Sequence, residues 1–454
     1  MSKPRHITIL GGGIAGLSVG YYARKKGLPF TVYEAGNRIG GNCITLTYRG
    51  FRFDSGAHRF HDKDAEVTKE LKSLLGEDLK EINVPSQIYH KGTFVDFPLS
   101  PWSLLRNLGP YTFVKAGLEL LWSRLKNREP HRNFENFALH TYGKTVAESF
   151  LLNYTQKLWG LPCKRLSPNI AGKRMKGLHL TAFFAETILG GSGEKEHLDG
   201  SFYYPKRGIG TIAEKLGELC GKENILRNSK ITRVFHNQTQ IQALEVNGKE
   251  RVYTDEIVST LPITVLLQLM EPRPPEEILQ LAKDLYYRNM ILVAVFLNRE
   301  SVTENASVYF PDADCPFTRI YEPKNRSVYM SPPGKTSLVA EIPCLQGDEL
   351  WNTDDSRLIQ LIRSQITQLG WIDEEEIIGA LVSRMNYAYP VLEVGFEDKI
   401  KEIVTFLKRF DNLKLSGRNS KFTYTHVHDI IKSGKEIIGE YISDYQTQGL
   451  TQTF

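Results

Sequence analysis

The first segment of the chain alternates short apolar runs with glycine. Residues 6–10 form a β-branched run that predicts a strand, residues 17–26 have helical composition, and residues 29–33 predict a second strand. Between the first strand and the helix stand Gly11, Gly13 and Gly16, with the spacing G-x-G-x-x-G. A strand, a glycine turn, a helix and a strand in this order predict a dinucleotide-binding βαβ unit.

Each part of this unit has a physical role in holding a dinucleotide. The first glycine permits a tight turn, the second lets the backbone approach a pyrophosphate, and the third lets the helix pack closely on the sheet. The helix N-terminus, at Ile14 and Ala15, supplies amide donors and the positive end of the helix dipole. Glu34 ends the second strand and can accept a hydrogen bond from a ribose hydroxyl, which favours an unphosphorylated ribose over that of NADP.

The residues after Glu34 favour FAD over NAD. In a plain NAD-binding fold the strand would lead into another crossover helix, whereas here a basic residue and a second glycine pair follow. This extension resembles the FAD-binding superfamily of amine oxidases, protoporphyrinogen oxidases, phytoene desaturases and UDP-galactopyranose mutases. The cofactor contacts expected from it are Ala35, Arg38, Gly40, Gly41 and Asn42.

Four further segments resemble the same superfamily, so the likeness spans nearly the whole chain. They are residues 53–61, 154–160, 204–210 and 415–430, and the first two are similar to the UDP-galactopyranose mutase-like branch. The resemblance implies that the first passes the flavin ring and that the last ends at a helix N-terminus facing the pyrimidine end of the flavin. The further cofactor contacts that it implies are Gly56, Ala57, His58, Ile231, Gly417, Arg418, His428, Asp429 and Ile430.

The resemblance also nominates residues for catalysis and substrate binding. Tyr387 and Tyr389 are two residues apart, so on a strand they share a face, which either lines the cavity or packs into the core. Arg174 lies in a basic patch, and in the mutase-like branch a nearby arginine grips a substrate diphosphate. The catalytic candidates are His58, Trp159, Tyr389 and Arg418, and the substrate candidates are Arg174, Tyr387 and Tyr389.

Two histidines three residues apart, His58 and His61, raise the question of a metal site. No acidic or cysteine partner stands near them at ligand spacing, so no metal is expected.

These anchors predict an α/β fold whose Rossmann-like FAD-binding domain is discontinuous. We expect this domain to comprise residues 1–70, 200–265 and 405–454. The substrate domain is expected to combine a helical insertion, residues 71–199, with a mixed α+β part, residues 266–404.

Composition and charge indicate which partners and which cellular compartment to expect. The chain has 454 residues and a net charge of +5, which at this length does not indicate a nucleic-acid-binding protein. Five dispersed cysteines indicate reduced thiols, and no apolar run reaches the length of a transmembrane helix. Residues 7–23 are too rich in glycine for a signal peptide, so we expect a cytoplasmic protein. The expected partner is a small-molecule substrate, with a nucleotide sugar or another glycan precursor as one candidate, and the sequence is compatible with a homo-oligomer.

Two kinds of flavin chemistry remain open. The first is an FAD-dependent oxidoreductase of the amine oxidase or protoporphyrinogen oxidase type, with hydride transfer from substrate to flavin N5. The second is a reduced-flavin sugar-nucleotide mutase of surface polysaccharide biosynthesis. After Arg418 the chain continues with Asn419, Ser420 and Lys421, where the mutase pattern has leucine and glycine. This departure favours the oxidoreductase.

The glycine turn gives a direct test. The substitution Gly13→Val places a branched side chain where the pyrophosphate is expected, so the purified variant should lose its bound FAD and its visible flavin absorption. A variant as yellow as the wild-type protein would contradict the assignment of this loop to the phosphates.

Overall fold

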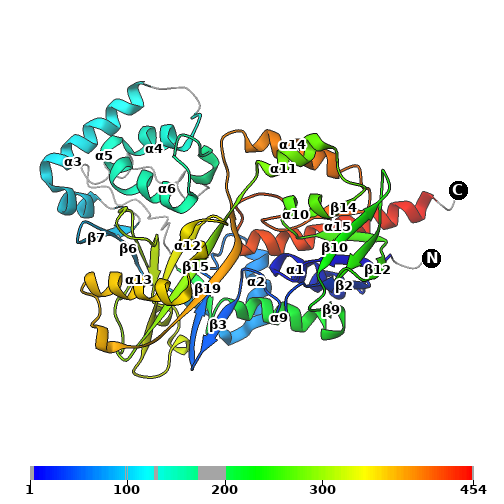
Figure 1. Cartoon of the computed structure of the whole chain (residues 1–454), viewed down its shortest axis with the longest axis horizontal. Coiled ribbons are helices and arrows are strands. Elements are labelled where there is room, and N and C mark those ends of the chain that lie inside the picture. Colours follow the sequence, from blue (N-terminus) through cyan, green and yellow to red (C-terminus); the bar gives the residue numbers. More distant parts are fainter. Residues whose placement is uncertain (1–4, 98, 100, 127–130, 172–200, 452–454) are drawn as a thin grey trace.

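The computed structural model describes residues 5–97, 99, 101–126, 131–171 and 201–451. Arg174 therefore lies outside the described residues. The molecule is elongated, with a helical lobe at one end and the N-terminal βαβ unit at the other (Figure 1).

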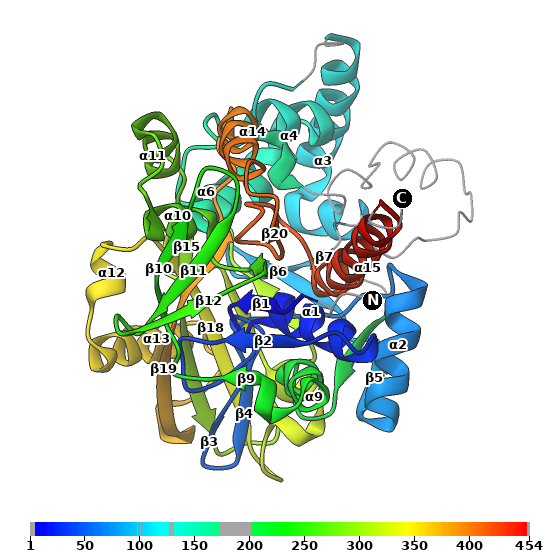
Figure 2. The same ribbon diagram turned by 90° about the vertical axis from the view of Figure 1, so that its right-hand side faces the viewer.

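A five-stranded parallel sheet is built from three distant segments of the chain. Its order is β20-β13-β1-β2-β9, and every neighbouring pair is parallel. Helix α1 follows β1 directly and packs against α9 and α15 (Figure 2). The bounds are β1 Ile7–Leu10, α1 Ile14–Lys25, β2 Phe30–Tyr33, α9 Gly210–Cys220, β9 Ile225–Leu226, β13 Glu256–Ser259, β20 Leu413–Leu415 and α15 Val427–Thr451.

A smaller four-stranded sheet, of order β12-β11-β10-β14, follows β9 in the sequence. Strands β10, β11 and β12 are antiparallel neighbours, and β14 pairs in parallel with β10. Helix α10 packs on β10 and on α11, which in turn packs on α14. The bounds are β10 Ile231–His236, β11 Ile241–Val246, β12 Glu250–Tyr253, α10 Ile263–Leu269, β14 Met270–Glu271, α11 Glu276–Lys283 and α14 Phe396–Leu407.

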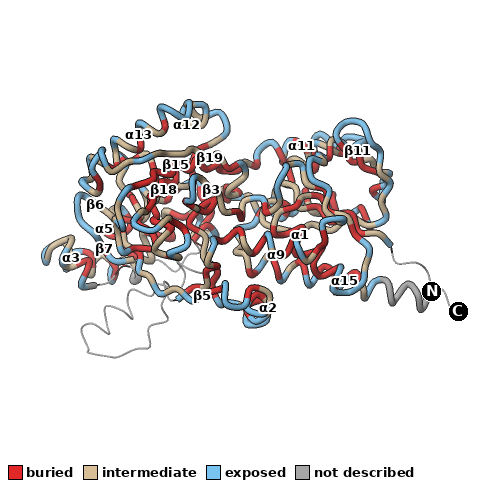
Figure 3. The backbone as a smooth tube through the Cα atoms, turned by 90° about the horizontal axis from the view of Figure 1, so that it is seen from below, coloured by how far each residue is buried: buried red, intermediate tan, exposed pale blue. Residues whose placement is uncertain are grey.

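The largest sheet has seven strands in the order β19-β15-β18-β17-β16-β6-β7. All residues of β15 and β18 are buried, because other strands flank them on both sides and helix α13 packs against β15 and β19. This sheet forms one of the two densely buried regions in Figure 3. The bounds are β6 Ser86–His90, β7 Thr93–Phe97, β15 Tyr287–Leu297, β16 Ser307–Tyr309, β17 Arg319–Tyr321, β18 Thr336–Cys344, α12 Glu349–Asn352, α13 Asp355–Gln368 and β19 Ile377–Pro390.

The helical lobe consists of α3, α4, α5 and α6. Helix α3 spans Pro101–Lys126 and is interrupted at Gly109, where φ is 78°. Helices α4, α5 and α6 span Phe134–Tyr142, Lys144–Val146 and Asn153–Trp159, with a π-helical stretch at Ala147–Leu152 and a 3-10 turn at Pro168–Ala171. The remaining elements are β3 Thr45–Tyr48, β4 Phe51–Asp54, α2 Ala65–Leu75, β5 Leu79–Ile82 and β8 Phe202–Pro205.

Beside the helices expected for residues 71–199, the described part of this range also contains strands. Strands β6 and β7 lie in this range and form a hairpin whose turn, Lys91 and Gly92, has positive φ at both residues. Strand β6 then pairs in parallel with β16. The sequence did not reveal the hairpin because its stabilising partner lies more than 200 residues further on. The domain boundaries themselves remain a prediction.

Two absences hold for the described part of the chain. No helix there is both long enough and apolar enough to cross a membrane. No three His, Cys, Asp or Glu side chains there are grouped so that they could hold a metal ion.

Because α1 packs closely on the first turn, we expect a side chain at Gly16 to lower the stability of the protein markedly. A β-carbon there would lie 2.0 Å from the carbonyl oxygen of Gly11, so Gly16→Ala should lower the free energy of unfolding by about 1–3 kcal/mol. At Gly439, in α15, no atom lies within 4 Å of such a β-carbon, so Gly439→Ala should stabilise by about 0.5–1 kcal/mol. Chemical denaturation of the two apoprotein variants measures both, and equal effects would contradict this packing.

Candidate active site

The glycine turn leaves an open space at the start of α1. Gly13 is the N-terminal cap of α1, and no side chain caps the helix. A β-carbon on Gly13 would meet only the Cα atom of Gly41, at 3.8 Å. The backbone therefore leaves room beside Gly13, at the N-terminus of α1. This arrangement fits the pyrophosphate of a dinucleotide.

Glu34 is held in place at the end of β2. Its two carboxylate oxygens accept hydrogen bonds from the amides of Gly12, at 2.8 Å, and Gly36, at 2.7 Å. Gly40 donates its amide to the carbonyl of Gly12 at 2.8 Å, so the second glycine pair lies against the first turn. Ala35 and Arg38 are exposed beside it. The predicted phosphate and ribose contacts thus form one continuous rim.

Asp54 anchors the loop that carries Gly56, Ala57 and His58. It is fully buried and accepts hydrogen bonds from the hydroxyls of Tyr204 and Thr45 and from the amide of Ile209. Burial raises the pKa of Asp54, and these three donors oppose that effect.

The next residues of this loop are held by a second buried carboxylate. Ala57 donates its amide to Glu341 at 2.7 Å, and Arg319 binds the same carboxylate through Nε at 2.9 Å and Nη2 at 2.8 Å. Glu341 is 2% exposed and comes from the buried strand β18. The pair therefore fixes the loop at the point where the resemblance places the flavin ring.

His58 is neutral at physiological pH. Burial, together with the positive charges of Arg418, Arg319 and Arg326, lowers its pKa to about 3. Arg326 is itself buried and donates through Nη2 to Ala306 O at 3.0 Å. Three guanidinium groups thus act on His58 in the same direction.

Two aromatic rings, those of Tyr389 and Tyr424, lie near the guanidinium of Arg418, and the ring of Trp159 packs beside both. The ring of Tyr389 lies 6.1 Å from that of Trp159 and 5.8 Å from that of Tyr424. Arg418 lies 5.6 Å from the Tyr389 ring and 5.3 Å from the Tyr424 ring. The four candidate catalytic residues, His58, Trp159, Tyr389 and Arg418, are therefore brought into one neighbourhood.

Buried Arg288 fixes the end of α6, where Trp159 stands. It donates through Nε to Leu158 O at 3.0 Å and through Nη2 to Pro343 O at 2.8 Å. A β-carbon on Gly160 would lie 2.5 Å from Nη1 of Arg288. The glycine after Trp159 is thus required by the arginine that caps the helix.

Tyr387 and Tyr389 do not share surroundings, contrary to the expectation for two residues on one strand. The Tyr387 ring packs edge-on against Tyr287, with ring centroids 5.2 Å apart, while Tyr389 faces Trp159 and Arg418. The reason is the backbone of Tyr387, whose φ of 54° breaks the alternation of the strand. Only Tyr389 joins the aromatic cluster.

The C-terminal segment returns to the start of α1. Gly417 has φ 88°, and a β-carbon there would lie 2.7 Å from Cβ of Ala15. His428 is buried beside Phe60, and Asp429 accepts the amide of His426 at 3.0 Å at the start of α15. Ile430 is half-buried in the apolar cluster around α1, and Ile231 is buried at the start of β10. Their predicted contacts with the cofactor remain predictions.

Sequence reasoning missed several residues of this neighbourhood: Tyr154, Tyr309, Arg319, Arg326 and Glu341. Glu341 stands alone as an acid in the apolar strand β18, and Arg319 begins the mostly apolar strand β17. A lone charge in a buried strand is a usable signal, because a buried charge needs a partner. Nothing local indicated that these two residues are partners.

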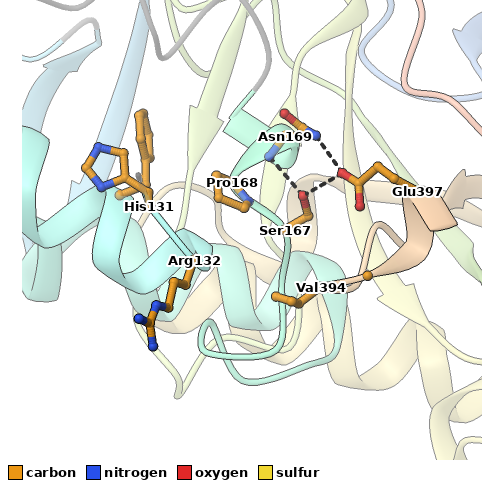
Figure 4. A pocket seen from close by; sticks show the side chains of 9 residues that line it. His131, Arg132, Ser167, Pro168, Asn169, Val394 and Glu397 are labelled. Carbon is orange, nitrogen blue, oxygen red and sulfur yellow. Dashed lines mark hydrogen bonds between the residues drawn. The ribbon is translucent and has the colours of Figure 1, made fainter. Parts of the chain in front are cut away.

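A pocket of about 620 Å³ lies elsewhere, between the start of α4 and the start of α14 (Figure 4). Glu397 accepts hydrogen bonds there from Asn169 at 2.6 Å and Ser167 at 3.3 Å. None of the site residues predicted from the sequence lines this pocket.

Comparison with known proteins defines the class. The sequence model of the family "Flavin containing amine oxidoreductase" matches residues 14–436, so the chain belongs to that family and is a flavoprotein enzyme. The family and its FAD-dependent neighbours imply FAD, which fits the open space at Gly13.

Individual relatives cover nearly the full length. The chain is 21% identical to coproporphyrinogen III oxidase of Bacillus subtilis (strain 168), over 97% of this chain and 98% of that protein. Among solved structures, reduced UDP-galactopyranose mutase has a TM-score of 0.84 at 19% identity, covering 97% of this chain and 96% of that one. Cyclohexylamine oxidase from Brevibacterium oxydans IH-35A has a TM-score of 0.68 at 12% identity, covering 98% and 100%. These structural likenesses show an FAD-dependent amine oxidase fold.

The neutral state of His58 predicts a pH-dependent stability. The unfolded histidine titrates near its ordinary pKa of 6.5, whereas folding lowers the pKa to about 3, so the unfolded chain binds more protons between these values. The contribution of His58 to stability is therefore lost as the pH falls below about 6.5, by up to about 1.4 kcal/mol per pH unit.

The variant His58→Gln removes this titration. Urea denaturation of both apoproteins at several pH values between about 7 and 5 should show a shallower loss of stability for the variant. Parallel curves would mean that His58 is not held neutral by the fold.

Proposed function

We propose that this protein is an FAD-dependent oxidoreductase that takes a hydride from a small-molecule substrate. The observation that carries the proposal is its similarity to a curated oxidase over 97% of the chain. When bound, FAD supplies the hydride acceptor at N5, and the protein supplies binding, orientation and electrostatics.

The residues around His58 suit this division of labour. Burial raises the pKa of both Tyr154 and Tyr389, so these phenols stay protonated and can donate hydrogen bonds. His58 is neutral and can donate or accept one hydrogen bond. Such groups orient a substrate and leave the removal of hydride to the cofactor.

The positive charges near His58 favour one class of substrate. Three guanidinium groups, of Arg319, Arg326 and Arg418, act on His58, and the carboxylate of Glu341 compensates one of them through its bidentate pair with Arg319. This environment favours a substrate bearing carboxylate or phosphate groups over an ammonium ion. The expected contact of Arg174 with such a group remains part of this proposal.

A second candidate is a reduced-flavin sugar-nucleotide mutase. Two observations favour it: the TM-score of 0.84 to reduced UDP-galactopyranose mutase, and the same positive charges, which suit a diphosphate. In that case the substrate would be a nucleotide sugar and no net oxidation would occur.

One set of anaerobic measurements separates the two candidates. The purified protein is expected to show the visible absorption of oxidised flavin, and coproporphyrinogen III, the substrate class named by the full-length relative, is the first probe. Bleaching of the flavin on mixing would support the oxidoreductase. The dithionite-reduced protein is then incubated with UDP-galactose or UDP-galactofuranose, and sugar interconversion only in the reduced state would replace the first proposal by the second.

The Gly13→Val variant serves as the control that lacks the cofactor. Flavin that responds to neither class of probe would direct the search to amines, alcohols and C–C desaturation. A wild-type protein that binds no FAD would overturn both candidates.

A further inference from the structure

The backbone of Tyr387 is unusual for its place in the fold. Its φ of 54° is in the left-handed region, which tyrosine rarely adopts because its Cβ crowds the backbone. Of the other non-glycine residues with positive φ, Arg49, Lys91 and Asn247 stand in hairpin turns directly before a glycine, whereas Asn228 and Phe422 do not precede a glycine. Tyr387 instead lies inside the strand β19 and is followed by Ala388. A conformation of this kind persists only where surrounding contacts determine it.

The pairing of β19 with β15 shifts at the same place. Tyr389 pairs with Arg288 and Met385 pairs with Met290, so residues 386–388 of β19 face the single residue Asn289 of β15. Asn289 is 4% exposed, and its Oδ1 accepts the amide of Tyr387 at 3.1 Å. Asn289, which belongs to the seven-stranded sheet, therefore provides the first contact that restrains the backbone of Tyr387.

Two further amides hold its carbonyl group. Asn42 donates through Nδ2 to Tyr387 O at 3.1 Å, and to Asn386 O at 2.9 Å. Asn419 donates through Nδ2 to Tyr387 O at 3.0 Å. Asn42 directly follows the glycine pair of the cofactor rim, and Asn419 directly follows Gly417 and Arg418. One carbonyl thus receives a donor from each of two segments that the proposed function assigns to FAD.

The residues that follow Tyr387 connect the C-terminal segment to the aromatic rings of Trp159, Tyr389 and Tyr424. Arg418 donates through Nη1 to Ala388 O at 3.1 Å, and its guanidinium lies 5.6 Å from the ring of Tyr389. Tyr287, which packs on the Tyr387 ring, donates its hydroxyl to Asn419 O at 2.9 Å. The left-handed turn at Tyr387 directs its own ring to Tyr287 and the Tyr389 ring to the active site.

We propose that Asn42, Asn289 and Asn419 are positioning residues that hold Tyr387 left-handed and thereby set Tyr389 relative to the cofactor loops. This inference rests on the proposed function for its link to FAD, but the hold on Tyr387 is a property of the protein alone. The three amides join the cofactor rim, the C-terminal segment and strand β15 at one residue, because Asn289 accepts the N–H of Tyr387 while Asn42 and Asn419 donate to its carbonyl oxygen. The placement of Tyr389 and the arrangement of the segments predicted to bind FAD are then coupled through Tyr387.

The test compares Asn289→Leu in two backgrounds, Tyr387→Gly and Tyr387→Ala. Both backgrounds remove the Tyr387 ring, but only glycine adopts the left-handed conformation freely. Asn289 lies in the seven-stranded sheet and is not one of the residues predicted to contact the cofactor. Its substitution therefore does not remove a predicted contact with FAD. The readouts are the dissociation constant of FAD, the visible spectrum of the bound flavin, and the thermal unfolding midpoint of the apoprotein.

In the Tyr387→Ala background, Asn289→Leu should weaken FAD binding about tenfold and shift the flavin spectrum. In the Tyr387→Gly background, the same substitution should weaken binding by less than about threefold and leave the spectrum unchanged. Asn289→Leu should also lower the thermal unfolding midpoint of the apoprotein more in the Tyr387→Ala background than in the Tyr387→Gly background, because only glycine adopts the left-handed conformation freely. Asn419→Leu should show the same dependence on the residue at position 387.

Equal losses in the two backgrounds, or no loss in either, would overturn the proposal. A variant that folds only in the glycine background supports it, whereas failure to fold in both would show that Asn289 acts independently of the backbone at position 387. If the wild-type protein binds no FAD, the proposed function falls, while the apoprotein midpoints still decide whether the amides hold Tyr387.

Discussion

The buried carboxylate of Glu341 is the constraint on which the active site depends. It lies in a strand that is buried throughout, yet it receives the amide of Ala57 from one side and the guanidinium of Arg319 from the other. Removing one partner of such a buried pair typically costs about 3–5 kcal/mol, because the other charge remains without compensation. The loop that the resemblance places beside the flavin is thus attached to the seven-stranded sheet by a contact whose loss on either side would be costly.

Electrostatics around this contact are relevant to both candidate reactions. The guanidinium groups that depress the pKa of His58 favour negative charge beside it, whether the charge belongs to a reduced cofactor or to a substrate. This effect would serve an oxidase and a mutase alike. The two reactions differ in the substrate that these guanidinium groups and the aromatic rings of Trp159, Tyr389 and Tyr424 would bind.

The sequence predicted the parts of the site that are local in the chain. The turn at Gly11, Gly13 and Gly16 is recognisable because every residue of the βαβ unit lies within one short segment. The pair of Arg319 and Glu341 was not predictable, because two strands far from any motif bring it together. The left-handed backbone of Tyr387 was missed for a related reason: three amides from distant segments impose it, and tyrosine itself gives no signal for it.

The strand order of the parallel sheet has a consequence for synthesis of the protein. Strands β1 and β2 are made first, but their partners β13 and β9 come from residues 256–259 and 225–226, and β20, which pairs with β13, comes from residues 413–415. Contacts so distant in sequence form slowly, since the loop between them must close first. On the ribosome, the outer edges of β1 and β2 therefore stay unpaired until β9 and β13 have been made, and the edge of β13 stays unpaired until β20 follows. An unpaired strand edge can pair with another chain, so we expect the nascent protein to be most prone to aggregation during these intervals.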